Sequence, residues 1–249
     1  MGEEFNKYGL SRYIPENVRR QIRKESGFGC VICGGAFITY EHIDPTFAEA
    51  REHDPQKMTL LCWGCHGRVT KGVWSKDKVR SAQQAPITFR NGCANDAFDF
   101  RDPFELFLGN NHFQDVSCIV RKSSGEEWLK IEPPEDPEAP PRINAKFYGF
   151  DGLPDLEIIG NEWTCSTDVW DLRTEGNRIE VYKAKNQLLL RLKAKPPHGL
   201  GIQYLKMLFL DTGIEVGNDG KVDFIIKGKK PFNIDSSMVS GADSVFLVP

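Results

Sequence analysis

The sequence predicts an α+β fold class in which a small metal-stapled domain is followed by a larger β-rich domain. Two observations lead to this prediction. Two Cys-x-x-Cys pairs, Cys30/Cys33 and Cys62/Cys65, lie close together near the start of the chain. After Pro86 the sequence changes to short β-prone runs separated by turn residues. The predicted boundary therefore gives domains 1–85 and 86–249.

The paired cysteines predict a structural zinc site. A tetrahedral structural Zn²⁺ takes four thiolates, and each Cys-x-x-Cys knuckle places two sulfur atoms on one side of the ion. We therefore expect Cys30, Cys33, Cys62 and Cys65 to bind Zn²⁺. His66, which directly follows the second knuckle, is an alternative ligand, but the cysteine set is already complete. The other three cysteines are scattered, and we expect them to be reduced and buried; they are Cys93, Cys118 and Cys165.

Helix signals flank the two knuckles. Residues 15–25 predict a helix, with proline and an acid at its start and basic residues at its end. Its basic side chains are either a solvated face or a phosphate contact; they are Arg19, Arg20, Arg23 and Lys24. Further helices are expected from residue 65 to 71 and from 75 to 85, the latter with Ser75 as its N-cap.

Two β-prone runs lie between the knuckles. Residues 37–40 form a predicted strand that ends at Glu41 and His42, and residues 58–61 form the return strand. An acid-rich loop over 44–57 connects them. An acid and a histidine are therefore expected at a strand end beside the zinc site.

The remainder of the chain has the pattern of an all-β domain. Its β-like runs lie ten to twenty residues apart, which fits a sandwich, a barrel or an irregular solenoid. We expect strands over 97–100, 116–121, 127–131, 143–148, 156–159, 178–182, 188–192, 205–210 and 222–227. The proline-rich stretch 132–141 has β pattern on both sides, so we interpret it as an excursion within this domain and not as a linker.

Composition restricts the class of protein. The 249 residues are 40% hydrophobic and 27% charged, which is typical of a globular protein. No apolar run approaches the roughly 18 residues of a membrane span, and the N-terminus has no secretory signal pattern. We therefore expect a cytoplasmic protein without a membrane partner. Residues 1–85 contain 13 Lys and Arg and 10 Asp and Glu, whereas residues 86–249 contain 19 Lys and Arg and 25 Asp and Glu. The first domain therefore has a positive balance, and DNA contact is expected there.

The order of these motifs resembles a known enzyme family. Cys30-x-x-Cys33, Glu41-His42-Ile43-Asp44-Pro45, Cys62-x-x-Cys65-His66 and Thr70-Lys71-Gly72 are similar to an HNH endonuclease of the ββα-metal type with a four-cysteine zinc site. The resemblance covers about residues 14–80. It implies a ββα-metal nuclease domain within the first 85 residues.

The resemblance also implies roles for individual residues. His42 matches the general base, while Glu41 and His66 match the ligands of a catalytic Mg²⁺ or Mn²⁺. Glu41 stands where the family has Asp, and Lys57 stands where it has Asn. Lysine cannot accept a hydrogen bond from the base histidine as an amide can. We expect His53 to take that orienting role or to approach the metal, with phosphate binding as the alternative role of Lys57.

The expected function is therefore a metal-dependent HNH endonuclease that cleaves phosphodiester bonds in DNA, in a defence, restriction or mobile-element setting. The first alternative is a catalytically impaired, zinc-dependent DNA-binding module. The second is an interaction protein that acts through its β-rich domain, by self-association or with an unidentified partner. His42 has a structural alternative as an ordinary strand histidine. Trp63 and Trp74 either stack on bases or cover the small zinc core.

Overall fold

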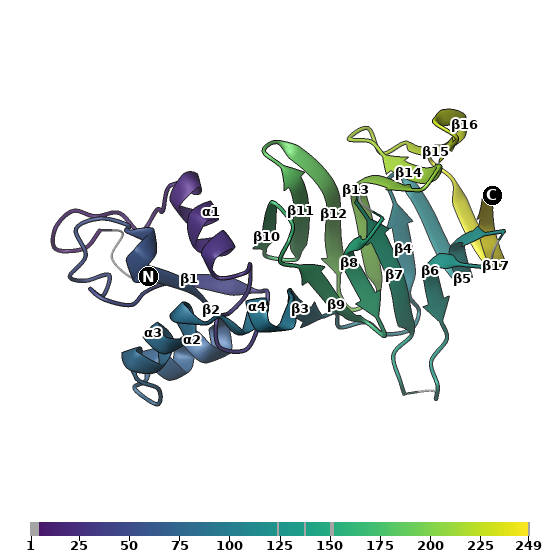
Figure 1. The fold of residues 1–249 in the computed structure, drawn as a ribbon. Coiled ribbons are helices and arrows are strands. Elements are labelled where there is room, and N and C mark those ends of the chain that lie inside the picture. The colour runs from purple at the N-terminus through teal and green to yellow at the C-terminus, as the bar shows by residue number, and fades with distance from the viewer. Residues whose placement is uncertain (1–4, 124, 137, 150–151, 249) are drawn as a thin grey trace. The chain divides into compact units, whose positions relative to one another are not determined.

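The structure is a computed structural model that describes residues 5–123, 125–136, 138–149 and 152–248. Its chain divides into two compact units, Met1–Asp96 and Ala97–Pro249 (Figure 1). The first contains all the helices listed below, and the second is built from strands. Each unit is described separately.

The first unit contains a short β-hairpin followed directly by a helix. Strands β1 and β2 pair antiparallel, with Ile38 opposite Cys62 and His42 opposite Met58. Because β2 runs straight into α2, the three elements form a small ββα arrangement. The elements are α1 (Glu16–Glu25), β1 (Ile38–His42), the 3₁₀ helix η1 (Pro55–Lys57), β2 (Met58–Cys62), α2 (Trp63–Thr70), α3 (Lys76–Gln84), α4 (Ile87–Asn91) and β3 (Cys93–Ala97).

Apolar side chains on both faces of β2 pack into hydrophobic clusters of this unit, because successive side chains of a strand point to opposite faces. Leu60 and Met58 pack with Ile22 of α1. Leu61, on the other face, belongs to a cluster that includes the buried cysteines; its members are Cys30, Val31, Ile43, Leu61, Cys65, Val69 and Val79. Cysteines of both knuckles are therefore part of a hydrophobic core.

Helix α4 and strand β3 lie beyond the expected boundary at residue 85 but belong to the first unit. The amide of Ile87 donates to the carbonyl of Val31 at 3.1 Å, and the Thr88 hydroxyl donates to the carbonyl of Ser26 at 2.8 Å. The backbone amide of Ala36 in turn donates to the backbone carbonyl of Asn95 at 2.9 Å. These bonds fasten residues 86–96 to the first knuckle, so the compact unit extends to Asp96.

The second unit is a single, strongly curled sheet. Its strands are β4 (Glu105–Leu108), β5 (Asn111–Lys122), β6 (Glu127–Glu132), β7 (Arg142–Tyr148), β8 (Pro154–Ile159), β9 (Glu162–Ser166), β10 (Asp171–Glu175), β11 (Arg178–Ala184), β12 (Gln187–Lys195), β13 (Gly199–Phe209), β14 (Thr212–Val216), β15 (Val222–Ile226), β16 (Lys229–Ile234) and β17 (Met238–Val248). The main path runs β10-β11-β12-β13-β4-β5-β6-β7-β8-β9.

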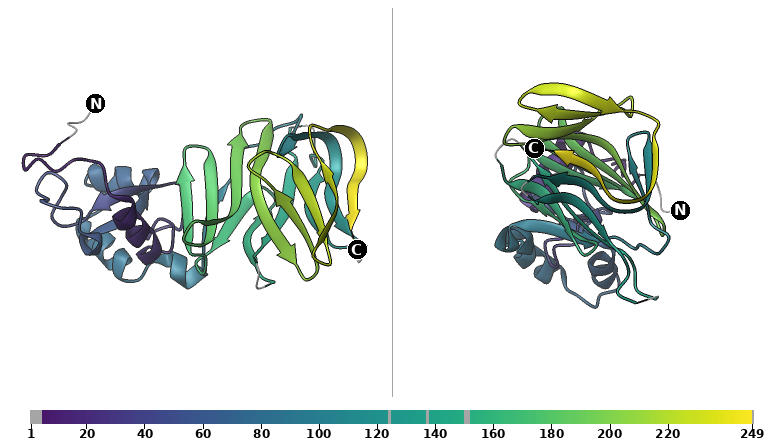
Figure 2. Two further views of the ribbon diagram at one scale, coloured as in Figure 1. Left: turned by 90° about the horizontal axis from the view of Figure 1, so that it is seen from above. Right: turned by 90° about the vertical axis from the view of Figure 1, so that its right-hand side faces the viewer.

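Two parallel pairings interrupt an otherwise antiparallel sheet, β13 with β4 and β17 with β5. The curl brings together strands that are distant in the sheet order. Lys183 of β11 forms an ion pair with Asp155 of β8 at 2.8 Å, although these strands are not neighbours in the sheet. The views in Figure 2 show the strands wrapping into a half-barrel. The sandwich and solenoid alternatives do not describe this unit, because its strands form one curled sheet.

Most of the predicted strands occur close to their expected positions, but the run 97–100 does not form a strand beyond Ala97. Phe98 and Phe100 are instead buried and stacked, with ring centroids 5.2 Å apart. The β propensity of these phenylalanines therefore reflects core packing. Strands that the sequence did not predict are β4, β9, β10, β14, β16 and β17.

The proline-rich stretch is an excursion, as expected. Strand β6 ends at Glu132 and β7 begins at Arg142, and these two residues are direct partners in an antiparallel pair. The intervening residues therefore connect two neighbouring strands of one sheet.

We also searched the helices of the described residues for a membrane span. None is both long enough and apolar enough to cross a bilayer.

Candidate functional site

The four cysteines of the two knuckles converge on one point. Their sulfur atoms all lie within 4.8 Å of one another. The Cys33 sulfur is 3.5 Å from that of Cys62 and 3.8 Å from that of Cys65. Disulfide sulfur atoms lie about 2.05 Å apart, so these thiols are free. A tetrahedral zinc with Zn–S bonds of about 2.3 Å would separate its sulfurs by about 3.8 Å. The donor set therefore fits a metal ion such as zinc.

Local backbone geometry forms each knuckle. In the first, the Gly34 amide donates to the carbonyl of Cys30 at 2.8 Å, and Cys30 donates to Gly35 at 2.9 Å. Gly34 has φ of 87°, a conformation that favours glycine. In the second, Cys62 is the N-cap of α2, and its sulfur accepts from the Cys65 amide at 3.4 Å. The tight turn and the helix start each orient two thiols inward.

The thiols also influence each other's ionisation. A hydrogen bond from Cys33 lowers the pKa of Cys30 to about 5, although burial opposes this. Burial raises the pKa of Cys65 to about 12, and the negative charge of Cys30 adds to that increase. Ionising all four thiols without a cation therefore carries an electrostatic cost. A divalent ion at the centre would compensate for that charge, which is the chemical reason that this set suits a metal.

A histidine pair lies at the end of β1. His53 Nδ1 is 3.2 Å from His42 Nε2, and His53 Nε2 is 2.9 Å from the carbonyl of Ser11. A carbonyl only accepts, so His53 must carry its proton on Nε2 and, when neutral, accepts on Nδ1. His42 then donates through Nε2, and its Nδ1 retains a lone pair. The contacts thus select the tautomer of His42 that can accept a proton on Nδ1.

His42 is neutral near physiological pH. Its side chain is buried, and burial is the largest of the causes that together lower the pKa of His42 to about 4. The neighbouring His53 and Lys76 contribute to this lowering, whereas the negative charge of Glu41 opposes it. A neutral imidazole is the form that a general base requires.

Glu41 and His66 meet beside this pair. His66 Nε2 lies 3.0 Å from Glu41 Oε2, and the Glu41 side chain is only 13% exposed. A separation of 3.0 Å is hydrogen-bond spacing, so the imidazole of His66 and the carboxylate of Glu41 are in direct contact.

Lys76 contacts the same carboxylate and was not among the expected site residues. Its ammonium donates to Glu41 Oε1 and to the carbonyl of His42, the latter at 2.7 Å. Lys76 is the first residue of α3, whose N-cap is Ser75. A positive side chain in the first turn is unfavourable with respect to the helix dipole. That unfavourable position was the sequence signal that could have identified Lys76.

Lys57 lies near the histidines but contacts them little. Its ammonium is 3.3 Å from Asp54 Oδ2, and its side chain is 53% exposed. Its carbonyl accepts from the amide of Ile43 at 2.9 Å. Lys57 and His42 both line a cavity of about 240 Å³. Among the expected residues, His53 therefore contacts the ring of His42, and Lys57 supports the adjacent backbone.

The basic residues of α1 have mainly structural contacts. Arg23 is 4% exposed and donates to the Tyr40 hydroxyl and to Glu16, both at 2.7 Å. Arg19 pairs with Glu16 as well, at 3.0 Å. Glu16 therefore neutralises the centre of this cluster, and the contacts of Arg19 and Arg23 lie within the first unit.

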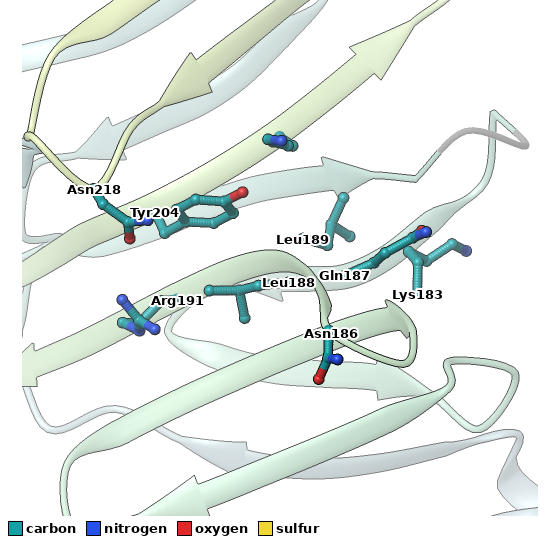
Figure 3. A pocket seen from close by; sticks show the side chains of 9 residues that line it. Lys183, Asn186, Gln187, Leu188, Leu189, Arg191, Tyr204 and Asn218 are labelled. Carbon is teal, nitrogen blue, oxygen red and sulfur yellow. The ribbon is translucent and has the colours of Figure 1, made fainter.

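The second unit contains a cavity of about 450 Å³ on strands β11, β12 and β13 (Figure 3). Cationic side chains, amides and one phenol line it; they include Lys183, Arg191, Lys206, Gln187 and Tyr204. Lys183 is paired with Asp155 at 2.8 Å, and Arg191 with Glu180 at 2.6 Å. Because two of its three cations already have carboxylate partners, this cavity offers little net charge to a ligand.

We compared the chain with protein-family models, with curated proteins and with solved structures, and none of the three comparisons gave a match. Any assignment of function therefore depends on the geometry described above.

Proposed function

We propose that the first unit is a metal-dependent endonuclease of the HNH type that cleaves phosphodiester bonds in DNA. The observation that carries the proposal is the position of His42. It donates to His53 through one ring nitrogen, and its strand neighbour Glu41 contacts His66. The proposed base and one proposed divalent-ion ligand, Glu41, are thus consecutive residues of one strand end. The second proposed ligand, His66, lies on α2 and directly follows Cys65 of the four-cysteine cluster.

Each side chain has a defined part in this proposal. His42 Nδ1 accepts a proton from the attacking water, and His53 stabilises the resulting imidazolium through its bond to Nε2. Glu41 and His66 would hold a Mg²⁺ or Mn²⁺, and that ion would neutralise negative charge on the phosphate and the departing oxygen. Lys76 keeps the Glu41 carboxylate in position. Zinc at the cysteines stabilises the fold and takes no part in the reaction.

A second candidate function is a zinc-dependent DNA-binding module without cleavage. The contact between Lys76 and Glu41 favours it, because an ammonium on this carboxylate competes with a divalent ion for the same oxygen. Lys57 in place of the family's Asn favours it as well, since its ammonium is 3.3 Å from Asp54 and not on His42.

Nicking of supercoiled plasmid distinguishes the two candidates. Purified zinc-loaded protein is incubated with plasmid and Mg²⁺ or Mn²⁺, and in parallel with EDTA. Open-circular product that depends on the divalent ion and is lost in His42→Ala supports the endonuclease. A gel shift that shows DNA binding at a defined salt concentration, together with no nicking in the presence of either divalent ion, supports the binding module. The absence of both would leave only the interaction role of the β-rich unit.

A further inference from the structure

Trp63 differs from the other tryptophans in its surroundings. It is 71% exposed, whereas Trp128 and Trp163 are 2% and 0% exposed. Trp74 packs against the cysteine core, with the charged ends of Arg68 and Lys78 over its ring. Among the described residues, no aromatic ring or cation lies against the Trp63 indole. Both faces of the Trp63 ring are therefore available for stacking by another molecule.

The position of Trp63 places this indole beside the candidate site. It is the first residue of α2, so His66 lies three residues later and Gly67 four residues later. Residues with these spacings share a helix face, with Cβ atoms about 5–6 Å apart. His66 is the residue that contacts Glu41. The exposed indole is therefore about one helical turn from the proposed divalent-ion ligands.

Gly67 leaves the same helix face open. A Cβ placed on Gly67 would meet nothing within 4 Å, and its backbone is helical. Neither packing nor conformation therefore requires glycine here, although glycine weakens a helix relative to alanine. What glycine provides is bare backbone between Trp63 and the following turn. Such a surface allows another molecule to approach closely.

The charge of this region suits a polyanion. Residues 63–85 contain five Lys and Arg and only one acid, Asp77. The exposed basic residues Lys71 and Lys78 lie close in sequence to the α2 face. Helix α1, by contrast, uses Arg19 and Arg23 to bind Glu16. Within residues 63–85, Lys76 pairs with Glu41, and Arg80 pairs with Asp44 and Asp77. The positive charge that α2 and α3 offer to a polyanion therefore comes from Arg68, Lys71 and Lys78.

We propose that Trp63 is a stacking platform for an unpaired nucleobase next to the scissile phosphate, so that the protein prefers single-stranded or branched DNA to continuous duplex. The proposal rests on the endonuclease function proposed above. In a duplex, neighbouring base pairs already cover both faces of a base, whereas an unpaired base offers a free face to an aromatic ring. The open backbone at Gly67 accommodates the attached sugar and phosphate.

The test measures DNA affinity separately from cleavage. Zinc-loaded protein is titrated, without added Mg²⁺ or Mn²⁺, into a labelled single-stranded oligonucleotide and into a duplex of the same sequence. Trp63→Ala should weaken single-strand binding about tenfold and change duplex binding less than twofold. Trp63→Phe should retain most of the single-strand affinity. Phe89→Ala is the matched control, because Phe89 is an exposed aromatic residue, 50% accessible, on α4 of the same unit.

Gly67→Leu provides an independent arm. Leucine favours the helix relative to glycine, and a Cβ at this position meets nothing within 4 Å, so the melting temperature should be unchanged or higher. Its side chain would cover the open backbone, so single-strand affinity should fall together with that of Trp63→Ala. Weaker DNA binding in a variant that is no less stable cannot result from unfolding.

Several results would overturn the proposal. The first is a Trp63→Ala variant that binds single strands as tightly as the wild type does, and the second is an equal loss of affinity for duplex and single strand in that variant. The third is a wild type that binds no DNA. The fourth is a wild-type dimer that dissociates in Trp63→Ala, as measured by sedimentation. The last result would assign the indole to self-association. The two proposals can fail separately. Trp63-dependent single-strand binding without nicking removes the endonuclease only, whereas nicking with Trp63-independent binding removes the platform only.

Discussion

His53 Nδ1 lies 3.2 Å from His42 Nε2, and the opposite nitrogen of His53 lies 2.9 Å from the carbonyl of Ser11. This chain of contacts leaves the free lone pair of His42 on Nδ1. His53 thus makes the contact with His42 that we propose orients the base. Lys57, which stands at the asparagine position of the family that the sequence resembles, is directed to Asp54.

The first prediction concerns this orienting contact. His53→Ala should reduce the nicking rate by about tenfold to a hundredfold, part of the contribution that a positioned base makes. His53→Asn should retain more activity, because its amide oxygen can accept from His42. Lys57→Ala should have a small effect on rate. Initial rates of plasmid nicking measure all three, and equal rates for His53→Ala and the wild type would exclude the orienting role.

The second prediction concerns the base and the ligand pair. His42→Ala should reduce nicking by about 10²- to 10⁴-fold without loss of zinc or of the folded state. His66→Ala should raise the Mg²⁺ or Mn²⁺ concentration needed for half-maximal nicking, because it removes one ligand. Metal titrations of the nicking rate separate the two effects. Unchanged rates in both variants would show that the site lies elsewhere.

The third prediction concerns the cysteine cluster. Cys30→Ser or Cys65→Ser should lose about one equivalent of zinc and unfold the first unit, because metal binding at such a site contributes folding free energy. The second unit contains none of the four ligands and should retain its β-sheet signal. Elemental analysis and far-UV circular dichroism measure these outcomes. Cys93→Ser is the control, since Cys93 lies outside the cluster. Zinc-free wild-type protein would contradict the prediction.

The fourth prediction concerns Lys76. Removing its ammonium in Lys76→Ala frees an oxygen of Glu41, so Mn²⁺ should bind more tightly in calorimetric titration. The nicking rate at saturating Mn²⁺ should fall if the ammonium also positions Glu41. Lys78→Ala is the control, because Lys78 is on the same helix but contacts Trp74 and not Glu41. Identical Mn²⁺ affinity in Lys76→Ala and the wild type would exclude competition.

The fifth prediction concerns Arg23. Arg23→Met should destabilise the first unit by about 1–3 kcal/mol, because the half-buried Tyr40 hydroxyl loses a charged hydrogen-bond partner. Lys24→Ala, at the exposed neighbouring position, should change stability by less than about 0.5 kcal/mol. Chemical denaturation of the first-unit transition measures both. Equal stabilities would show that the Arg23 contacts are energetically unimportant.

Local elements of the first unit were predictable from the sequence. Proline, an early acid and late basic residues predicted a helix over 15–25, and α1 spans Glu16–Glu25. Ser75 is the N-cap of α3, where its hydroxyl accepts from the Lys78 amide at 3.2 Å. Helix starts depend on residues that are adjacent in the chain, so their signals are visible without the fold.

Strand pairing in the β-rich unit could not be predicted from the sequence. Short β-prone runs between turn residues predicted strands at the positions of β11 and β12, but such runs contain no information on which strands pair. The parallel pairings of β13 with β4 and of β17 with β5 join segments far apart in the chain. A curled half-barrel follows from such pairings, whereas strand propensity alone is equally compatible with a sandwich or a solenoid.

By itself, the sequence determined the two knuckles, the histidine at a strand end and the helix that follows the second knuckle, because spacing within a short segment controls each of them. Only the tertiary structure decided which distant side chains meet at the site. Lys76 reaches Glu41 across 35 positions of the chain, and Arg23 is buried against Tyr40 although its helix pattern suggested an exposed basic face. Contacts of this kind depend on how the elements pack, and packing is a property of the whole unit.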